Sequence, residues 1–175
     1  MAKTKNHLFE KWELVDQIKK TRSVDDYSEG IAKAIDMQKF YGVTSACTFV
    51  DIDPVVGYKA LDGAISARNS YPGFHLKIAC QTLKGILDRE AHDLIEERIS
   101  DIDIVGSLPG ADKGREDKHL DVVMEMAKFY GKMLHVHVDQ LNSPMEKETE
   151  LLARKTIEWG MEGKVVAIHS ISLAK

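Results

Sequence analysis

The chain has 175 residues, of which 43% are hydrophobic and 30% are charged, and its formal net charge is −4. This length suffices for one globular core, and the acidic balance excludes the basic surface typical of nucleic-acid-binding proteins. No apolar run approaches the roughly 20 residues of a membrane-spanning helix, and no apolar signal region follows the basic residues 1–6. We therefore expect one cytoplasmic α/β domain over residues 1–175, without nucleic-acid or membrane partners.

The two cysteines, Cys47 and Cys80, both lie in apolar runs that are typical of strands. Because no framework of spaced cysteines accompanies them, we expect both to be buried, reduced thiols. Two cysteines cannot complete a structural zinc site by themselves.

Helical and strand patterns alternate along the chain. Asn6 is a candidate cap for a first helix over residues 8–20, and Ser23 is a candidate cap for a second helix that ends at Gly42. The later helices are predicted over residues 56–69, 88–100, 115–130 and 143–159, the last of them beginning with Ser143, Pro144 and Glu146. The strands are predicted over residues 43–50, 74–80, 102–105, 134–138 and 164–170.

The predicted strands recur about every 30 residues, and a helix precedes each of them, which is the spacing of βαβ units. Such units form a parallel sheet with right-handed crossovers. The strands are nearly all apolar, which favours a sheet that is buried on both faces. Five strands are too few for a complete (β/α)8 barrel of about 250 residues, so the pattern leaves two architectures open: a doubly wound sheet or part of a barrel.

The strand over residues 134–138 carries the strongest chemical signal. His135 and His137 project to the same face, because strand side chains alternate with period 2. A histidine pair of this kind can bind one metal ion, although a hydrogen-bonded core histidine gives the same spacing. Asp139 and Gln140 follow at the strand end, where barrels collect their catalytic residues, and His169 ends the next strand.

Polar residues also follow the earlier strands. Asp51 and Asp53 fit the chemistry of a turn better than substrate binding, because Asp-x-Asp-Pro is a turn sequence. Gln81 and Thr82 are candidate substrate contacts beyond the second strand. Neither a phosphate-binding glycine motif nor a Ser-His-Asp pattern is apparent in the sequence.

Two of these segments resemble the cytosine deaminase branch of the amidohydrolase superfamily: His-Val-His-Val-Asp-Gln at 135–140 and Val-Ala-Ile-His-Ser at 166–170. Residues 8–12 are similar to the helix after the family's first strand, and Thr-Phe-Val-Asp at 48–51 is similar to its Thr-His-Val-Asp. Val-Gly-Ser-Leu-Pro at 105–109 is similar to its Val-Gly-x-x-Pro loop. The resemblance covers nearly the whole chain in the correct order.

The resemblance implies a partial (β/α)8 barrel that hydrolyses C–N bonds of small cyclic amides and amidines, with one divalent zinc or iron ion activating water. It assigns His137 to the metal and places His169 and Gln140 at the catalytic positions. Gln140 takes the place of a proton-shuttling glutamate, and His135 and Asp139 join it as expected substrate contacts. A neutral amide has no proton to exchange near pH 7, so Gln140 is expected only to form hydrogen bonds.

Other departures from the family concern the metal ligands. The family's first-strand His-x-His pair and eighth-strand aspartate fall outside residues 1–175, so we expect the central part of a barrel, from a truncated frame or partial gene. The fourth-strand segment has no lysine, which implies a mononuclear parent site, and Leu83 replaces a substrate-binding glutamine, which disfavours cytosine itself. With one histidine ligand, the chain alone is expected to be weakly active or inactive.

The second hypothesis is a non-catalytic α/β protein that self-associates or binds a partner. An open five-stranded sheet has two unpaired edges, and unpaired edges favour association. Both hypotheses therefore predict a homodimer formed through the sheet edges.

Overall fold

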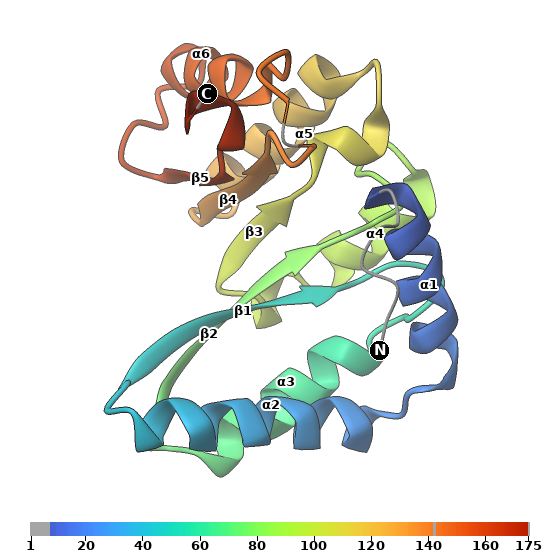
Figure 1. The fold of residues 1–175 in the computed structure, drawn as a ribbon, viewed down its shortest axis with the longest axis vertical. Helices are drawn as coiled ribbons and strands as arrows, with labels where there is room; N and C mark the ends of the chain where they lie inside the picture. The colour runs from blue at the N-terminus through green and yellow to red at the C-terminus, as the bar shows by residue number, and fades with distance from the viewer. Residues whose placement is uncertain (1–7, 142, 175) are drawn as a thin grey trace.

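The computed structural model describes residues 8–141 and 143–174, in which helices and strands alternate (Figure 1). The α-helices are α1 (Leu8–Thr21), α2 (Val24–Phe40), α3 (Lys59–Ser70), α4 (Arg89–Glu97), α5 (Glu116–Phe129) and α6 (Glu148–Glu158). The strands are β1 (Ser45–Asp51), β2 (His75–Gln81), β3 (Ile104–Ser107), β4 (Met133–Val138) and β5 (Val165–His169). Short 3-10 turns are η1 (Ile99–Asp101), η2 (Pro109–Asp112) and η3 (Ile171–Ala174).

The five strands form one parallel sheet whose spatial order, β1-β2-β3-β4-β5, is also the chain order. Right-handed crossovers between strands in sequential order place every connecting helix on the same side of the sheet. The sheet curves into the half-barrel seen in Figure 1. The prediction of a partial (β/α)8 barrel is therefore confirmed, and the doubly wound alternative is excluded.

The sheet is not covered equally on both faces, so the prediction from the apolar strands was wrong on this point. In β4, Leu134, Val136 and Val138 are buried against the helices, whereas His135 and His137 on the other face are only half-buried. In β2 the first residues alternate between exposed and buried in the same way. Because the sheet is a half-barrel, its concave face carries side chains that no described helix covers.

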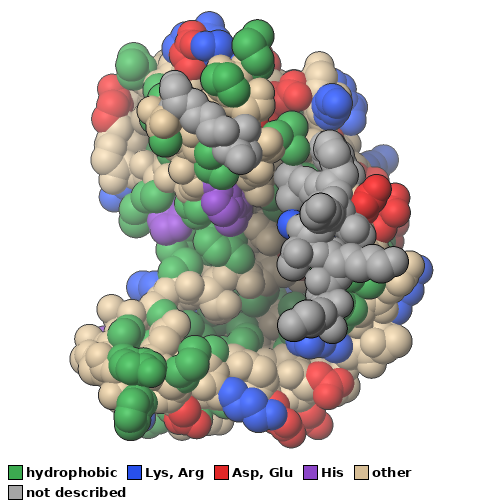
Figure 2. All heavy atoms as spheres, in the orientation of Figure 1, with side chains coloured by type: hydrophobic (Ala, Val, Ile, Leu, Met, Phe, Trp, Pro, Cys, Tyr) green, Lys and Arg blue, Asp and Glu red, His purple; other side chains and the backbone are tan. Residues whose placement is uncertain are grey.

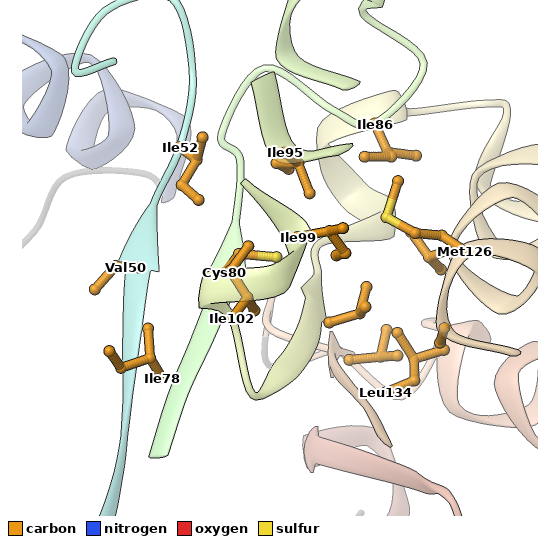
Figure 3. Close-up of a cluster of buried hydrophobic side chains, with 14 of the residues drawn as sticks. Val50, Ile52, Ile78, Cys80, Ile86, Ile95, Ile99, Ile102, Met126 and Leu134 are labelled. Carbon is orange, nitrogen blue, oxygen red and sulfur yellow. The ribbon is translucent and has the colours of Figure 1, made fainter. Parts of the chain in front are cut away.

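The core lies between the convex face of the sheet and the helices. Figure 3 shows its side chains meeting from several strands and turns, including Val50, Ile78, Cys80, Ile99 and Leu134. Ile78, Cys80 and Leu134 are completely buried there. Burial of this kind contributes about 25 cal/mol per Å² of apolar surface, so this core stabilises the packing of the helices against the convex face of the sheet.

Helix starts were predicted correctly where the cap is local. The capping box of α2 is present: Asp26 N donates to Ser23 Oγ at 3.1 Å, and Ser23 N donates to Asp26 Oδ2 at 2.8 Å. The predicted cap Asn6 lies outside the described residues. The helix predicted to run to residue 100 ends at Glu97 and continues as the 3-10 turn η1.

The last helix begins later than predicted. Ser143 and Glu146 form a separate turn, in which Ser143 N donates to Glu146 Oε2 at 3.1 Å, and α6 begins at Glu148. Asp139 explains the difference, because its Oδ1 accepts from Glu148 N at 3.0 Å and from Thr149 N at 3.4 Å. A carboxylate nine residues before the helix satisfies its first amides, so the cap at Ser143 does not set the start.

Cys80 is buried as predicted, but Cys47 is exposed. Both are free thiols. Cys47 lies on the edge strand β1, three residues before the core-facing Val50. Because strand side chains alternate, Cys47 points to the opposite face from Val50, which accounts for its exposure.

Among the described residues, no helix is both long and apolar enough to cross a membrane.

Candidate functional site

Two of the predicted site residues meet at the carboxyl end of the sheet. His137 Nδ1 lies 3.0 Å from His169 Nε2, and the two ring centroids are 5.0 Å apart. The backbone helps to bring them together: His169 and Ser170 have φ angles of 76° and 49°, a left-handed conformation that turns the chain away from the strand direction. The structure thus joins residues that are 32 positions apart in the sequence.

Burial keeps the imidazole of His137 neutral. Loss of solvation, reinforced by the neighbouring His169 and His135 rings, lowers the pKa of His137 to about 4. Burial also lowers the pKa of His135. The rings of Phe49 and His137 form an edge-on contact with centroids 4.6 Å apart, so an apolar wall contributes to this desolvation. At pH 7 the lone pairs of His137 are therefore available to a ligand.

One nitrogen of His137 has no partner among the residues described. Its Nδ1 is engaged by His169, whereas its buried Nε2 makes no hydrogen bond within residues 8–141 and 143–174. If His137 donates from Nδ1, the tautomer is fixed with a free lone pair on Nε2, as in metal-binding histidines whose other nitrogen is held by a neighbour. His137 therefore fits the role of a metal ligand.

The described residues do not complete a metal site around His137. Within the described ranges, one group of three potential ligands lies close together, Asp139, Glu146 and Glu148. Their oxygens already accept backbone hydrogen bonds: Glu148 Oε2 from Asp139 N at 2.9 Å, and Glu146 Oε1 from Leu141 N at 2.8 Å. Burial and the nearby carboxylates raise the pKa of Glu148 to about 7. This acidic group closes the loop before α6.

Asp139, an expected substrate contact, is completely buried and links three elements. Besides the α6 amides, its carboxylate accepts from the Thr149 and Ser172 hydroxyls, so it connects β4, α6 and η3. Burial opposes its charge, but these hydrogen bonds lower the pKa of the carboxyl. Its φ of 52° shows that the backbone is left-handed here as well. Asp139 thus holds the ends of β4 and β5, while Gln140 beside it is half-buried.

The aspartates after β1 surround a lysine that the sequence analysis missed. Lys19 of α1 is 3% exposed, and its Nζ lies 2.8 Å from Asp53 Oδ2 and 3.0 Å from Asp51 Oδ2. Burial disfavours the ammonium, but the two carboxylates raise its pKa. Asp53 also accepts from Val55 N at 2.9 Å, which confirms the predicted turn. Asp51 accepts from Gln81 Nε2 at 2.9 Å.

A buried Ser-His-Asp arrangement was also missed, because its members come from separate elements. Ser107 Oγ lies 2.6 Å from His119 Nε2, and His119 Nδ1 lies 2.7 Å from Asp112 Oδ2. Ser107 shares the face of Val136, with which it is paired, and that face packs against the helices. All three residues are at most 3% exposed, so the arrangement joins β3, η2 and α5 inside the protein and is closed to substrates.

The histidine pair lies on the concave face of the half-barrel. Figure 2 shows histidine side chains at a hollow of the molecular surface, beside hydrophobic side chains. Parallel α/β barrels place their catalytic groups at this carboxyl edge of the sheet. Of the predicted residues, His137, Asp139, Gln140 and His169 lie at or just beyond the carboxyl ends of β4 and β5, whereas His135 lies in the middle of β4 and lines a cavity with Lys132 and Met133 at the amino end.

Comparisons with known proteins give both uncharacterized relatives and enzymes of named activity. No protein-family model matches the chain. It is 45% identical over 172 residues to an uncharacterized protein of Haemophilus influenzae, covering 96% of this chain and 62% of that protein. It is 26% identical over 138 residues to the N-isopropylammelide isopropyl amidohydrolase of Pseudomonas sp., covering 77% of this chain and 34% of that enzyme. The 5-methylcytosine deaminase of Klebsiella pneumoniae, liganded with 5-fluorocytosine, matches with a TM-score of 0.83 and 26% identity, over 91% of this chain and 40% of that one.

The fold and site define a parallel α/β half-barrel with paired imidazoles at the carboxyl ends of its last two described strands. The comparisons confirm the resemblance found in the sequence motifs: the chain is similar, over most of its length, to part of a cytosine deaminase-like member of the amidohydrolase superfamily. It spans less than two thirds of each of these three proteins.

Proposed function

We propose that the whole protein is a metal-dependent hydrolase of non-peptide C–N bonds in cyclic amides or amidines. The single observation that carries this proposal is the neutral His137, whose buried Nε2 is left without a protein partner beside His169. The names of the relatives support the reaction type, because they include an amidohydrolase and a deaminase.

The proposed reaction adds water across a C–N bond, so that the carbon gains an oxygen and the nitrogen leaves as ammonia or an amine. A bound zinc or iron ion would supply the activation of water. In this chain His137 would hold the ion through Nε2, and His169 would fix the tautomer of His137 through its hydrogen bond. The Gln140 amide cannot exchange a proton near pH 7, so we assign the role of assisting the reaction at this rim to His169, which lies beside His137.

Catalytic zinc sites normally have three protein ligands, and among the described residues His137 is the one ligand that fits such a site. We therefore expect the 175-residue chain alone to turn over slowly. The test is release of ammonia or amine from cytosine, 5-fluorocytosine and N-isopropylammelide, with and without added zinc or ferrous ion.

The expected result is slow, metal-stimulated release that is lost in His137→Asn and retained in His75→Asn. His75 is a suitable control because it is an exposed histidine at the opposite end of β2. Release that ignores added metal, or that survives His137→Asn, would overturn the proposal.

A non-catalytic, self-associating protein is the second candidate. The observation that favours it is the topology: within the described residues, β1 and β5 each have a neighbouring strand on one side only. Edge strands present unpaired backbone groups that can pair with another chain. Failure of the hydrolysis assay together with a dimeric mass would favour this candidate.

A further inference from the structure

A cavity of about 640 Å³ lies at the amino ends of β3 and β4, far from the carboxyl end where the histidine pair meets. His135 lines it from the middle of β4, and Lys132 and Met133 line it at the start of that strand. Pockets that hold small organic ligands have volumes of about 300–1,000 Å³. The cavity is therefore large enough for a small organic molecule.

This cavity is separate from the position proposed for the metal. Met133 is the first residue of β4 and His137 is the fifth, so at about 3.3 Å per residue they are about 13 Å apart along the strand. Barrel enzymes place their chemistry at the carboxyl ends of the strands. A ligand at the amino ends would thus take no part in the reaction proposed for His137.

The charges in the cavity do not balance. Among the described residues that line it, Lys77 and Lys132 are cationic and Asp103 is the single carboxylate. Asp103 is already neutralised from outside the cavity, because Arg68 Nη1 lies 3.0 Å from its Oδ2. Lys77 Nζ lies farther from it, 3.4 Å from Oδ1. The chain as a whole carries a net charge of −4, so this local surplus of positive charge runs against the overall balance.

Lys132 has donors to spare. Within residues 8–141 and 143–174 its ammonium forms no ion pair, and its Nζ donates to the carbonyl oxygen of Ile102 at 2.5 Å. An ammonium group has three N–H donors, so two remain for a ligand. Lys132 is half-buried, and a charge in such a position interacts more strongly with an anion than it would in bulk water.

Apolar groups line the same cavity. The side chain of Met133 is 38% exposed, and Ile104 of β3 pairs with it across the strands. The hydroxyl of Tyr130 donates to Glu96 Oε1 at 2.9 Å, so what Tyr130 offers to the cavity is its ring. Methionine sulfur and aromatic rings both make favourable contacts with flat aromatic ligands.

We propose that this cavity binds an organic anion, a carboxylate carried on a flat apolar group, with Lys132 against the carboxylate and Met133 against the apolar part. Two lysines facing one aspartate leave a single positive charge, which matches a single carboxylate. The site goes beyond the proposed function, because neither the metal nor His137 takes part in it.

The test compares two probes of the same shape on the full chain, freed of metal by dialysis. The probes are 2-naphthoate, which is an anion, and 2-naphthamide, which is neutral. Calorimetric titration gives the affinities, and the methyl NMR signal of Met133 reports the place of binding. We expect 2-naphthoate to bind at least about tenfold more tightly than 2-naphthamide, with the Met133 signal shifting.

Matched variants assign the preference to one charge. In Lys132→Met the preference for 2-naphthoate should be nearly lost while 2-naphthamide binds as before, and Lys132→Arg should retain the preference because it keeps the charge. Lys20→Met removes an exposed cation on α1, outside the cavity, and should change neither affinity. If Lys132→Met fails to fold, Lys77→Met replaces it, because the Lys77 side chain is 65% exposed and its loss also removes the surplus charge.

Equal affinity for the two probes, no binding of either, or 2-naphthoate binding that leaves the Met133 signal unmoved would overturn the inference. An unchanged preference in the folded Lys132→Met, or in Lys77→Met where that variant replaces it, would overturn it as well. Because the measurement involves neither metal nor turnover, its outcome is independent of the hydrolysis assay.

Discussion

His137 combines a lowered pKa with a position at the strand end, and the two together give a pH signature. The unfolded chain takes up a proton on this histidine near its ordinary pKa of about 6.5, whereas the folded chain does so only near pH 4. Between these values the unfolded state binds more protons, so the free energy of unfolding decreases as the pH falls from about 6.5 to about 4.

We therefore predict that His137→Gln flattens the pH dependence of stability in this window. The measurement is urea unfolding of the wild type and the variant at several pH values between 4 and 7. His75→Gln, at an exposed position, should keep the wild-type slope. Identical slopes for His137→Gln and the wild type would show that His137 is not held neutral by the fold.

Lys19 is a second residue whose burial gives a testable consequence. Its ammonium is surrounded by Asp53, Asp51 and Asp16, the last at 3.4 Å. Lys19→Met would leave these carboxylates without their shared cation, and breaking a buried ion pair in this way costs about 3–5 kcal/mol. Chemical denaturation should show this loss, whereas Lys20→Met, at the exposed neighbouring position, should change stability by about 0.5 kcal/mol or less. A Lys19→Met variant as stable as the Lys20→Met control would contradict the structure here.

At the residue scale, sequence reasoning found what local periodicity determines. The period-2 rule correctly placed His135 and His137 on one face of β4. The position of His169 at the end of the next strand correctly indicated that it lies close to His137. Sequence reasoning could not find the contacts that link Lys19, Asp51 and Gln81, because they depend on the packing of α1 over two strand ends. The Ser107–His119 contact was missed because it depends on how α5 packs against β3.

At the level of elements, the structure depends on the close approach of β2 and β3. Gly106 is the residue that permits it, since a Cβ there would lie 1.9 Å from a backbone oxygen of Cys80. Backbone cannot move aside as a flexible side chain can, so Gly106→Ala should destabilise the protein by more than about 3 kcal/mol or prevent folding.

The control for this variant is Gly73→Ala, because a Cβ at Gly73 would meet nothing within 4 Å. Thermal unfolding of the control should stay within about 0.5 kcal/mol of the wild type. Equal melting temperatures for the two variants would show that β2 and β3 do not approach as closely as the structure has them.

The elements themselves were largely predictable, and their boundaries were less so. All five strands and the six α-helices of the described ranges were expected in the observed order, because each carries its own apolar pattern. The start of α6 was wrong because Asp139, a residue from the preceding strand end, caps the helix in place of Ser143. Local cap signals cannot reveal a cap supplied from across a loop.

At the scale of the whole molecule, the open topology bears on association. Within the described residues β1 and β5 are the two edges of the sheet, and the exposed Val166 lies on one of them. We propose that two copies pair through these edges, so light scattering at micromolar concentration should give twice the 19.6 kDa chain mass. A monomeric mass across the concentration range would reject this proposal.

The sheet order also explains why the concave face was mispredicted. Strands in sequential order with right-handed crossovers leave one face without helices, and that arrangement was one of two that the sequence left open. The apolar composition of the strands suggested two covered faces, but Gln81, His135 and His137 lie on the open one. The polar residues of the strands were therefore the informative ones.

The central claim is that His137 presents a free, neutral Nε2 as a metal ligand, and a zinc titration followed by long-range nitrogen NMR of the histidine rings tests it directly. We predict that the His137 Nε2 signal is the first to shift as zinc is added, that His75→Asn leaves this shift unchanged, and that His137→Asn abolishes zinc binding on the concave face. A titration in which the His137 signal stays fixed, or in which His137→Asn binds zinc there as the wild type does, would contradict the account.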